Sequence, residues 1–287
     1  MIKFPFLPAV ACAALVFAIS CSSFPASQSS RREAQKPLSD DTTGPVLRVA
    51  FSPQYFSPDG VTEELSIFLS VMDESPIGKW KLEIHDSQPP YLLFYHWEGN
   101  GQPPEKLNWD GRSMNGELVL SASDYPLEFT VSDTWGNTST IESLVEVDVF
   151  TKREGDMLLI QIPSVAFRTS TETWDSQDDD IIESNHWILE RMVQILDRLS
   201  DYRVFIEGHA NPTVNPDDKT GSIREQTLEL LPLSESLAKA IMIELVMLGI
   251  DPQRLKSYGL GGAQPLVPWE DRDNWWKNQR VEILLIR

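Results

Sequence analysis

Two kinds of hydrophobic pattern divide the chain. Between Pro45 and Phe150, short β-prone runs alternate with turn residues. In Trp80-Lys81-Leu82-Glu83-Ile84, apolar side chains alternate with charged ones, which predicts a strand with one buried and one wet face. Several short strands separated by turns within about a hundred residues favour an all-β, immunoglobulin-like sandwich over residues 45–150. The expected strands are 46–51, 65–72, 80–85, 91–97, 117–121, 127–132 and 144–150.

After residue 155 the pattern changes to alternating strands and helices, so we predict a second domain over 155–287. Apolar residues at helical spacing predict a helix over 183–199, and a second helix over 233–248 ends at Gly249. The predicted order is β-α-β-α-β with a closing strand, an α+β domain. Its strands are expected at 157–162, 203–207, 255–258 and 281–286.

The first 20 residues form an apolar run with one early cation, Lys3, and they end in Ala18-Ile19-Ser20-Cys21. This pattern predicts an export signal that is too short to span a bilayer comfortably. It resembles the lipobox of bacterial lipoproteins, which implies cleavage before Cys21 and lipidation of that cysteine. A cleaved soluble signal or a retained anchor helix is the alternative.

Residues 21–44 are polar and predict a flexible tether. Ser22 and Ser23 stand where an acidic residue would favour the inner membrane. By the lipoprotein resemblance we therefore expect anchoring in the outer membrane, facing the periplasm. Cys12 and Cys21 are the only cysteines, so the exported body would have no disulfide.

Composition excludes one class of partner. Lys plus Arg number 24 against 43 Asp plus Glu, a formal net charge of -19 over 287 residues. A surface that tracks nucleic-acid phosphates needs clustered cations, so we expect no nucleic-acid partner. Aromatic side chains in the first domain could stack on a ligand, but we expect them to fill the sandwich core. They are Trp80, Trp97, Trp109 and Trp135.

Turn clusters in the first domain carry a family resemblance. Phe56-Ser57-Pro58-Asp59-Gly60, Trp109-Asp110-Gly111-Arg112 and Asp133-Thr134-Trp135-Gly136-Asn137 supply Gly or Asn where tight turns need positive φ. Their order resembles the FlgD-type immunoglobulin-like module. This resemblance implies a spacer or a protein-docking surface. Asp59, Glu63, Asp110 and Asp133 are far apart in the sequence, so we do not expect them to form a calcium site.

Five ordered motifs in the second domain carry another resemblance: Gly208-His209-Ala210-Asn211, Leu233-Ser234, Tyr258-Gly259, Gln264-Pro265 and Asn278-Gln279-Arg280-Val281-Glu282. Together they resemble the OmpA-like C-terminal (peptidoglycan-associated) domain family. The resemblance implies non-covalent binding of the diaminopimelate-type peptide stem of peptidoglycan. The implied ligand-binding positions are His209, Asn211, Leu237, Asn278 and Arg280.

Two of these positions depart from the family pattern. Asn211 stands where the family has an aspartate for the diaminopimelate ammonium, and Leu237 where it has an arginine for a carboxylate. Gln279 replaces the first arginine of the last motif, and we expect residues 212–232 to form a loop that is longer than the family's. Shifting the helix register to use Lys239 moves Ile241, Leu245 and Gly249 out of place. The departures preserve the predicted fold and weaken the predicted ligand.

No catalytic constellation, cofactor motif or metal-ligand spacing appears, so we expect neither an enzyme nor a cofactor. A metal or general-base role for His209 would need His or carboxylate residues nearby, and a loop-supporting role is favoured. The acids at 178–180 are expected to cap a helix beginning near Ile181. The Trp-rich segment 269–276 could dock a partner or pack on the sheet.

Two functions therefore remain open. The first is an outer-membrane lipoprotein that tethers the membrane to the cell wall through peptidoglycan. The second is a divergent periplasmic scaffold that has lost this ligand and docks another envelope protein.

Overall fold

A computed structural model describes residues 41–58, 64–164 and 179–287. The predicted signal (1–20), Cys21 and most of the predicted tether (21–44) lie outside these residues, as do Asp59, Glu63 and Asp178. No helix in the described ranges is long and apolar enough to cross a membrane.

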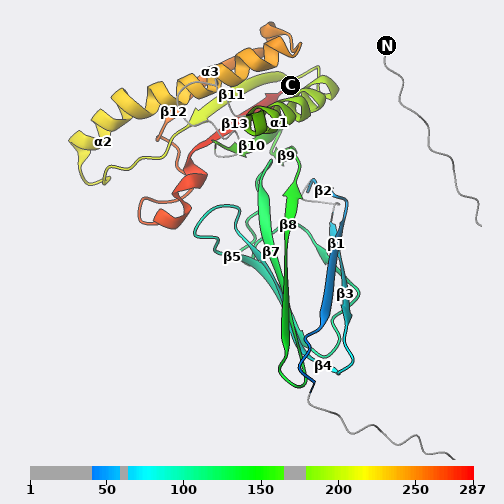
Figure 1. Cartoon of the computed structure of the whole chain (residues 1–287). Helices are drawn as coiled ribbons and strands as arrows, with labels where there is room; N and C mark the ends of the chain where they lie inside the picture. Colours follow the sequence, from blue (N-terminus) through cyan, green and yellow to red (C-terminus); the bar gives the residue numbers. More distant parts are fainter. Residues whose placement is uncertain (1–40, 59–63, 165–178) are drawn as a thin grey trace, which may run out of the picture. The chain divides into compact units, whose positions relative to one another are not determined.

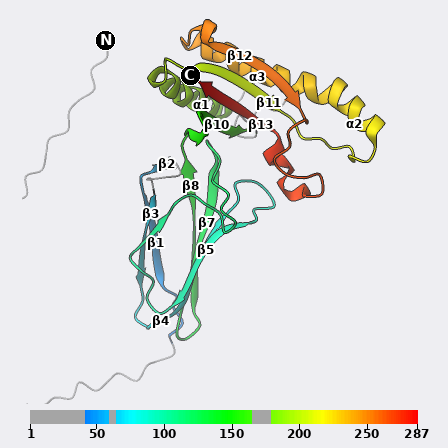
Figure 2. The same cartoon turned by 180° about the vertical axis from the view of Figure 1, so that it is seen from behind.

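Within residues 41–150, the described part contains only strands, which are arranged in two sheets (Figures 1 and 2). One sheet has the order β1-β3-β6 and the other β2-β8-β7-β4-β5. Neighbouring strands are antiparallel except β2 and β8, which pair in parallel. The strands are β1 (Val46–Ser52), β2 (Tyr55–Phe56), β3 (Leu65–Met72), β4 (Ile77–His85), β5 (Leu93–Asn100), β6 (Lys106–Trp109), β7 (Asp124–Asp133) and β8 (Thr138–Val147).

Alternating side chains of both sheets form one core. Leu65 and Ile67 of β3 pack in the same cluster as Leu82 of β4 and Phe129 of β7, and all four are fully buried. Trp80 and Trp109 belong to this core, as predicted, whereas Trp135 is 47% exposed, so its predicted core position is wrong. The immunoglobulin-like and FlgD-like assignments of this region stay predictions.

The predicted strand 117–121 is wrong, and β6 was not predicted. Residues 113–117 form a tight turn in which the Ser113 hydroxyl accepts from the amides of Asn115 and Glu117. The Leu120 amide donates to the Tyr125 hydroxyl at 3.0 Å. Because these amides bond to side chains, they are not available for a strand ladder, and only an isolated bridge joins Arg112 to Leu118.

The described part of residues 151–287 contains a sheet of order β12-β11-β13-β10-β9. Only β11 and β12 are parallel in it, and the other neighbours are antiparallel. The predicted β-α-β-α-β order with a closing strand is present. The elements are β9 (Lys152–Glu154), β10 (Met157–Pro163), α1 (Asp179–Arg198), β11 (Arg203–His209), α2 (Lys219–Glu225), η2 (Gln226–Leu230), α3 (Leu231–Met247), η3 (Pro252–Arg254), β12 (Leu255–Gly261), η4 (Arg272–Asn278) and β13 (Arg280–Ile286).

Helices α1 and α3 cover one face of this sheet. Met192 of α1 and Ile241 of α3 are fully buried in one cluster with Ile206 of β11 and Ile283 of β13. Because side chains alternate along a strand, residues 207 and 209 of β11 and 280 and 282 of β13 lie on the opposite face. That face carries two glutamates, a histidine and an arginine.

Candidate ligand-binding site

The first and last motifs meet beyond the end of β11. Asn211, two residues past the strand, accepts a hydrogen bond at its Oδ1 from Asn278 Nδ2 at 2.8 Å. Both side chains are buried, with 6% and 1% exposed. Residues 67 positions apart in the sequence therefore form one polar contact.

Asn278 also fixes the segment that precedes η4. Its Oδ1 accepts from the amides of Leu266 and Val267 at 2.7 and 3.0 Å, and its Nδ2 donates to the Val267 carbonyl at 3.2 Å. A buried amide with this many partners is costly to remove, because several backbone groups would lose their bonds. Asn278 is thus a positioning residue for the strand-end loops.

Arg280 is 3% exposed and bonds within the protein. Its Nε pairs with Glu282 at 2.7 Å, and its Nη atoms donate to the carbonyls of Asn278 at 3.3 Å and Gln264 at 3.1 Å. These bonds link β13 to the loop after β12.

The middle motifs bring α3 close to the sheet. A Cβ on Gly208 would collide with the backbone of Ser234, and one on Gly259 would lie 2.5 Å from the Glu235 amide. The Ser234 hydroxyl accepts from the Gly261 amide at 2.9 Å. These glycines therefore allow a helix-to-strand approach that a larger residue would prevent.

Leu237 lies on α3, half-buried, and packs against the core shared by the helices and the sheet. It does not line the groove described next. The structure therefore places Leu237 among apolar neighbours and away from Asn211's hydrogen-bond network.

A groove of about 490 Å³ lies beside Asn278. Glu225 lines it and is 5% exposed, and Lys219 lies at its exposed edge. The groove is bounded by the segment after β11 on one side and by residues 262–269 on the other. Its lining is Pro212, Val214, Pro216, Lys219, Ser222, Ile223, Glu225, Gln226, Thr227, Leu230, Gly262, Ala263, Pro265, Val267, Trp269 and Asn278.

The Glu225 carboxylate organises one wall of the groove. Its Oε1 accepts from the Thr213 amide at 2.9 Å and from the Thr213 hydroxyl at 2.5 Å. Its Oε2 accepts from the Val214 amide at 3.1 Å. Among the residues that the structure describes, no cation forms an ion pair with Glu225.

The opposite wall is tied to the same loop by Trp269. Its Nε1 donates to the Thr213 carbonyl at 3.1 Å, and Trp275 Nε1 donates to the Trp269 carbonyl at 3.0 Å. Arg272 stacks over both rings, 5.0 and 5.3 Å from their centroids. Part of the Trp-rich segment 269–276 thus closes the groove.

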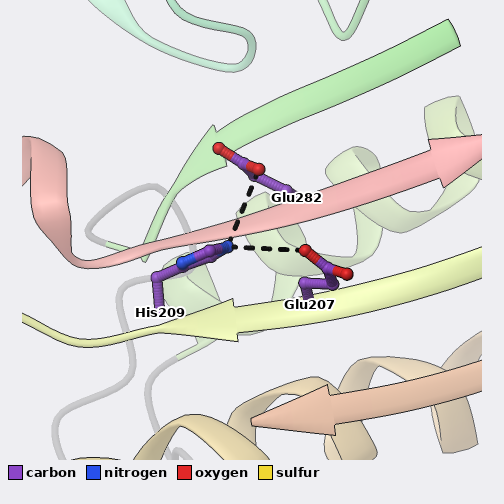
Figure 3. Close-up of side chains that lie close together, drawn as sticks. All are labelled: Glu207, His209 and Glu282. Carbon is purple, nitrogen blue, oxygen red and sulfur yellow. Dashed lines mark ion pairs between the residues drawn. The ribbon is translucent and has the colours of Figure 1, made fainter. Parts of the chain in front are cut away.

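The side chain of His209, on β11, points toward Glu207 and Glu282 (Figure 3). Its Nε2 lies 3.7 Å from Glu282 Oε2 and 4.0 Å from Glu207 Oε2. Burial, reinforced by Arg280, lowers the pKa of His209 from 6.5 to about 4, although Glu282 opposes the shift. The imidazole is therefore neutral near pH 7, between two carboxylates.

Three acidic residues of these sites, Glu207, Glu225 and Glu282, are not among the positions predicted from the sequence. A metal role for His209 requires carboxylates nearby, and the pairing of β11 with β13 supplies them, because it sets Glu207 opposite Glu282. Glu225 lies in the segment 212–232, which the sequence predicts as a loop, and no motif contains it. Glu282 belongs to the last motif, but the sequence does not show which residues lie beside it, because strand pairing decides this.

Comparisons with known proteins agree with the OmpA-like resemblance. No family model matches the chain. It is 24% identical over 221 residues to motility protein B of Helicobacter pylori (76% of this chain, 79% of that protein). It is 33% identical over 84 residues to the peptidoglycan-associated lipoprotein of Pseudomonas aeruginosa, covering 29% of this chain and 44% of that protein. The chain thus spans less than half of the second relative's length.

Among solved structures, the chain is similar to the OmpA-like domain of FopA1 from Francisella tularensis. The match has 18% identity and a TM-score of 0.35, and it covers 48% of this chain and 78% of that domain.

Proposed function

We propose that this protein is a peptidoglycan-binding lipoprotein that tethers the outer membrane to the cell wall without covalent chemistry. The observation that carries the proposal is the buried Glu225 carboxylate, which lines the groove beside Asn278 and has no cation partner in the described ranges. Its hydrogen bonds come from the neutral donors of Thr213 and Val214, so an ammonium group in the groove would add a charge-assisted partner.

Glu225 and Lys219 supply the two charges that Asn211 and Leu237 lack. The peptide stem of the wall offers an ammonium and carboxylates. We propose that Glu225 binds the ammonium and that the exposed Lys219 at the groove edge binds a carboxylate. Asn211, Asn278 and Arg280 support the loops that shape the groove.

The rest of the chain would place this groove at the wall. In the proposal, Cys21 carries the lipid anchor, residues 21–44 act as the tether, and the strand-only region is an immunoglobulin-like spacer. One of the relatives is named a peptidoglycan-associated lipoprotein, which supports this proposal, and another is motility protein B. The domain bounds remain those proposed from the sequence, 45–150 and 155–287.

The test is co-sedimentation of the purified protein with peptidoglycan sacculi. We expect wild-type protein to pellet with the sacculi and Glu225→Gln to lose affinity about 10- to 100-fold. A charge-assisted hydrogen bond contributes about 1.5–3 kcal/mol, and about 1.4 kcal/mol is tenfold in affinity. Glutamine keeps an acceptor for the Thr213 and Val214 amides, so the loop should stay folded.

Glu229→Gln is the matched control, because Glu229 is exposed and does not line the groove. It removes the same charge one turn further along the chain and should bind as wild type does. Equal binding by Glu225→Gln and wild type would contradict the assignment of the groove.

The scaffold function is the second candidate, and exposed apolar side chains favour it. Ile223, Leu228 and Leu233 are 68%, 64% and 43% exposed on consecutive helical segments. Such a surface suits a protein partner. If wild-type protein fails to pellet with sacculi but crosslinks to one envelope protein, the scaffold replaces the tether.

A further inference from the structure

The face of the sheet opposite the helices carries a second cluster. Strand pairing sets Glu207 directly opposite Glu282, and His209 lies two residues along β11 on the same face. Figure 3 shows the imidazole directed between the two carboxylates. One ligand atom from each residue lies within 4.8 Å of the others.

His209 has no hydrogen-bond partner in this cluster. Its side chain is 1% exposed, and neither Nδ1 nor Nε2 makes a hydrogen bond within the described structure. The gaps of 3.7 and 4.0 Å to the glutamates exceed hydrogen-bond length. A buried imidazole normally has a partner, so an unpartnered His209 directed between two carboxylates points to a ligand-binding role.

We propose that Glu207, His209 and Glu282 bind a divalent transition-metal ion of the zinc class. Zinc lies about 2.0–2.2 Å from nitrogen and oxygen ligands, so tetrahedral ligands lie roughly 3.3–3.5 Å apart. Small side-chain shifts would bring the observed atoms to that spacing. Three protein ligands leave a fourth position for water, and this proposal is independent of the peptidoglycan groove.

The donor set favours zinc over magnesium or calcium. Those two ions prefer all-oxygen cages, whereas an imidazole with two carboxylates suits zinc. Arg280 bonds to Glu282 Oε1 at 2.7 Å and leaves Oε2 toward His209, so it orients this ligand as outer-shell partners do.

Solvent can reach the site through the carboxylates. The side chains of Glu207 and Glu282 are 23% and 14% exposed, while His209 lies beneath them. A metal ion could therefore enter without unfolding the sheet.

The test is titration of the full, tag-free chain in detergent with ZnCl₂ by calorimetry, and with CoCl₂ by visible absorption. We expect one zinc per chain and the strong visible bands of four-coordinate cobalt. His209→Gln should weaken zinc binding at least 100-fold, and Glu207→Gln at least about 10-fold. Because Glu207 is partly exposed, its variant should fold even if the His209 variant does not.

His186→Gln is the matched control. His186 also lies near a carboxylate, with Nδ1 3.4 Å from Glu190, but it is 56% exposed on α1. It should leave zinc binding unchanged, and so should Glu225→Gln, which tests the groove separately. Absence of stoichiometric binding by wild type, or unchanged binding by Glu207→Gln, would overturn the proposal.

Discussion

At the scale of single residues, His209 makes the stability of the protein depend on pH. Its pKa is lowered to about 4 in the folded protein, from a usual 6.5, mainly by burial and then by Arg280. Between these values the unfolded chain binds a proton that the folded protein does not. The free energy of unfolding must therefore fall as the pH drops from about 6.5 to 4.

We expect His209 to account for a loss of about 3 kcal/mol across this range, because one pKa unit corresponds to about 1.4 kcal/mol. Urea unfolding of wild type and His209→Gln in EDTA, at several pH values, would measure it. The variant should show a flatter dependence.

Glu207 acts in the opposite direction, because burial and then Glu282 raise its pKa, so its contribution is lost as the pH rises. Glu207→Gln should therefore keep the His209 slope, and equal slopes for wild type and His209→Gln would contradict the assignment.

His209, Asn211, Asn278 and Arg280 could be identified from the sequence because short motifs contain them. The structure joins three of them through the Asn211–Asn278 and Arg280–Asn278 bonds. Glu207 could not be identified, because its significance arises only when β11 pairs with β13. Motifs thus reveal the positions but not the partners.

At the scale of elements, the approach of α3 to the sheet depends on Gly208. A Cβ there would meet the Ser234 backbone, which cannot move aside as a flexible side chain can. We expect Gly208→Ala to destabilise the protein by about 3 kcal/mol, the upper range for overpacking. Gly262→Ala is the control, because its Cβ would meet side-chain atoms alone, Leu230 Cδ1 at 2.9 Å and Pro212 Cδ at 3.1 Å. Thermal unfolding would compare them, and equal melting temperatures would show that α3 can shift.

The segment from 212 to 232 was the element that the sequence described least well. It was interpreted as a long loop, but α2 and the π-helical η2 run directly into α3. Gly221 and Ser222 have low helix propensity, and Pro232 suggests a break. Asp218 nevertheless caps α2 by accepting from the Gly221 amide, and Pro232 lies in the first turn of α3, where proline is tolerated.

The longer periodic elements were predicted well, because their apolar faces are long enough to show a period. Strand β10, helix α1 and strand β13 lie within a few residues of the expected bounds. Strand β6 has four residues, which are too few for a period to be recognised.

At the scale of the whole molecule, the proposed lipid anchor would decide in which part of the envelope the groove acts. We expect the wild-type protein to fractionate with the outer membrane and to begin with a diacylglyceryl Cys21 after processing. Cys21→Ser should remain unlipidated and lose this membrane association, because stable anchoring needs the acyl chains. Mass spectrometry of the N-terminus and membrane fractionation would measure both. Cys12→Ser lies inside the predicted signal and should behave as wild type.

Strand β13 lies in the middle of its sheet, between β11 and β10, although it is formed by the final residues of the sequence. Leu158 pairs with Leu285, so β10, which also pairs with β9, gains its second neighbour through a contact between residues far apart in the sequence. Such distant pairing is slow. A chain without β13 would therefore hold two separate strand pairs, β9 with β10 and β11 with β12, and β13 both joins them and supplies Glu282 to the histidine cluster.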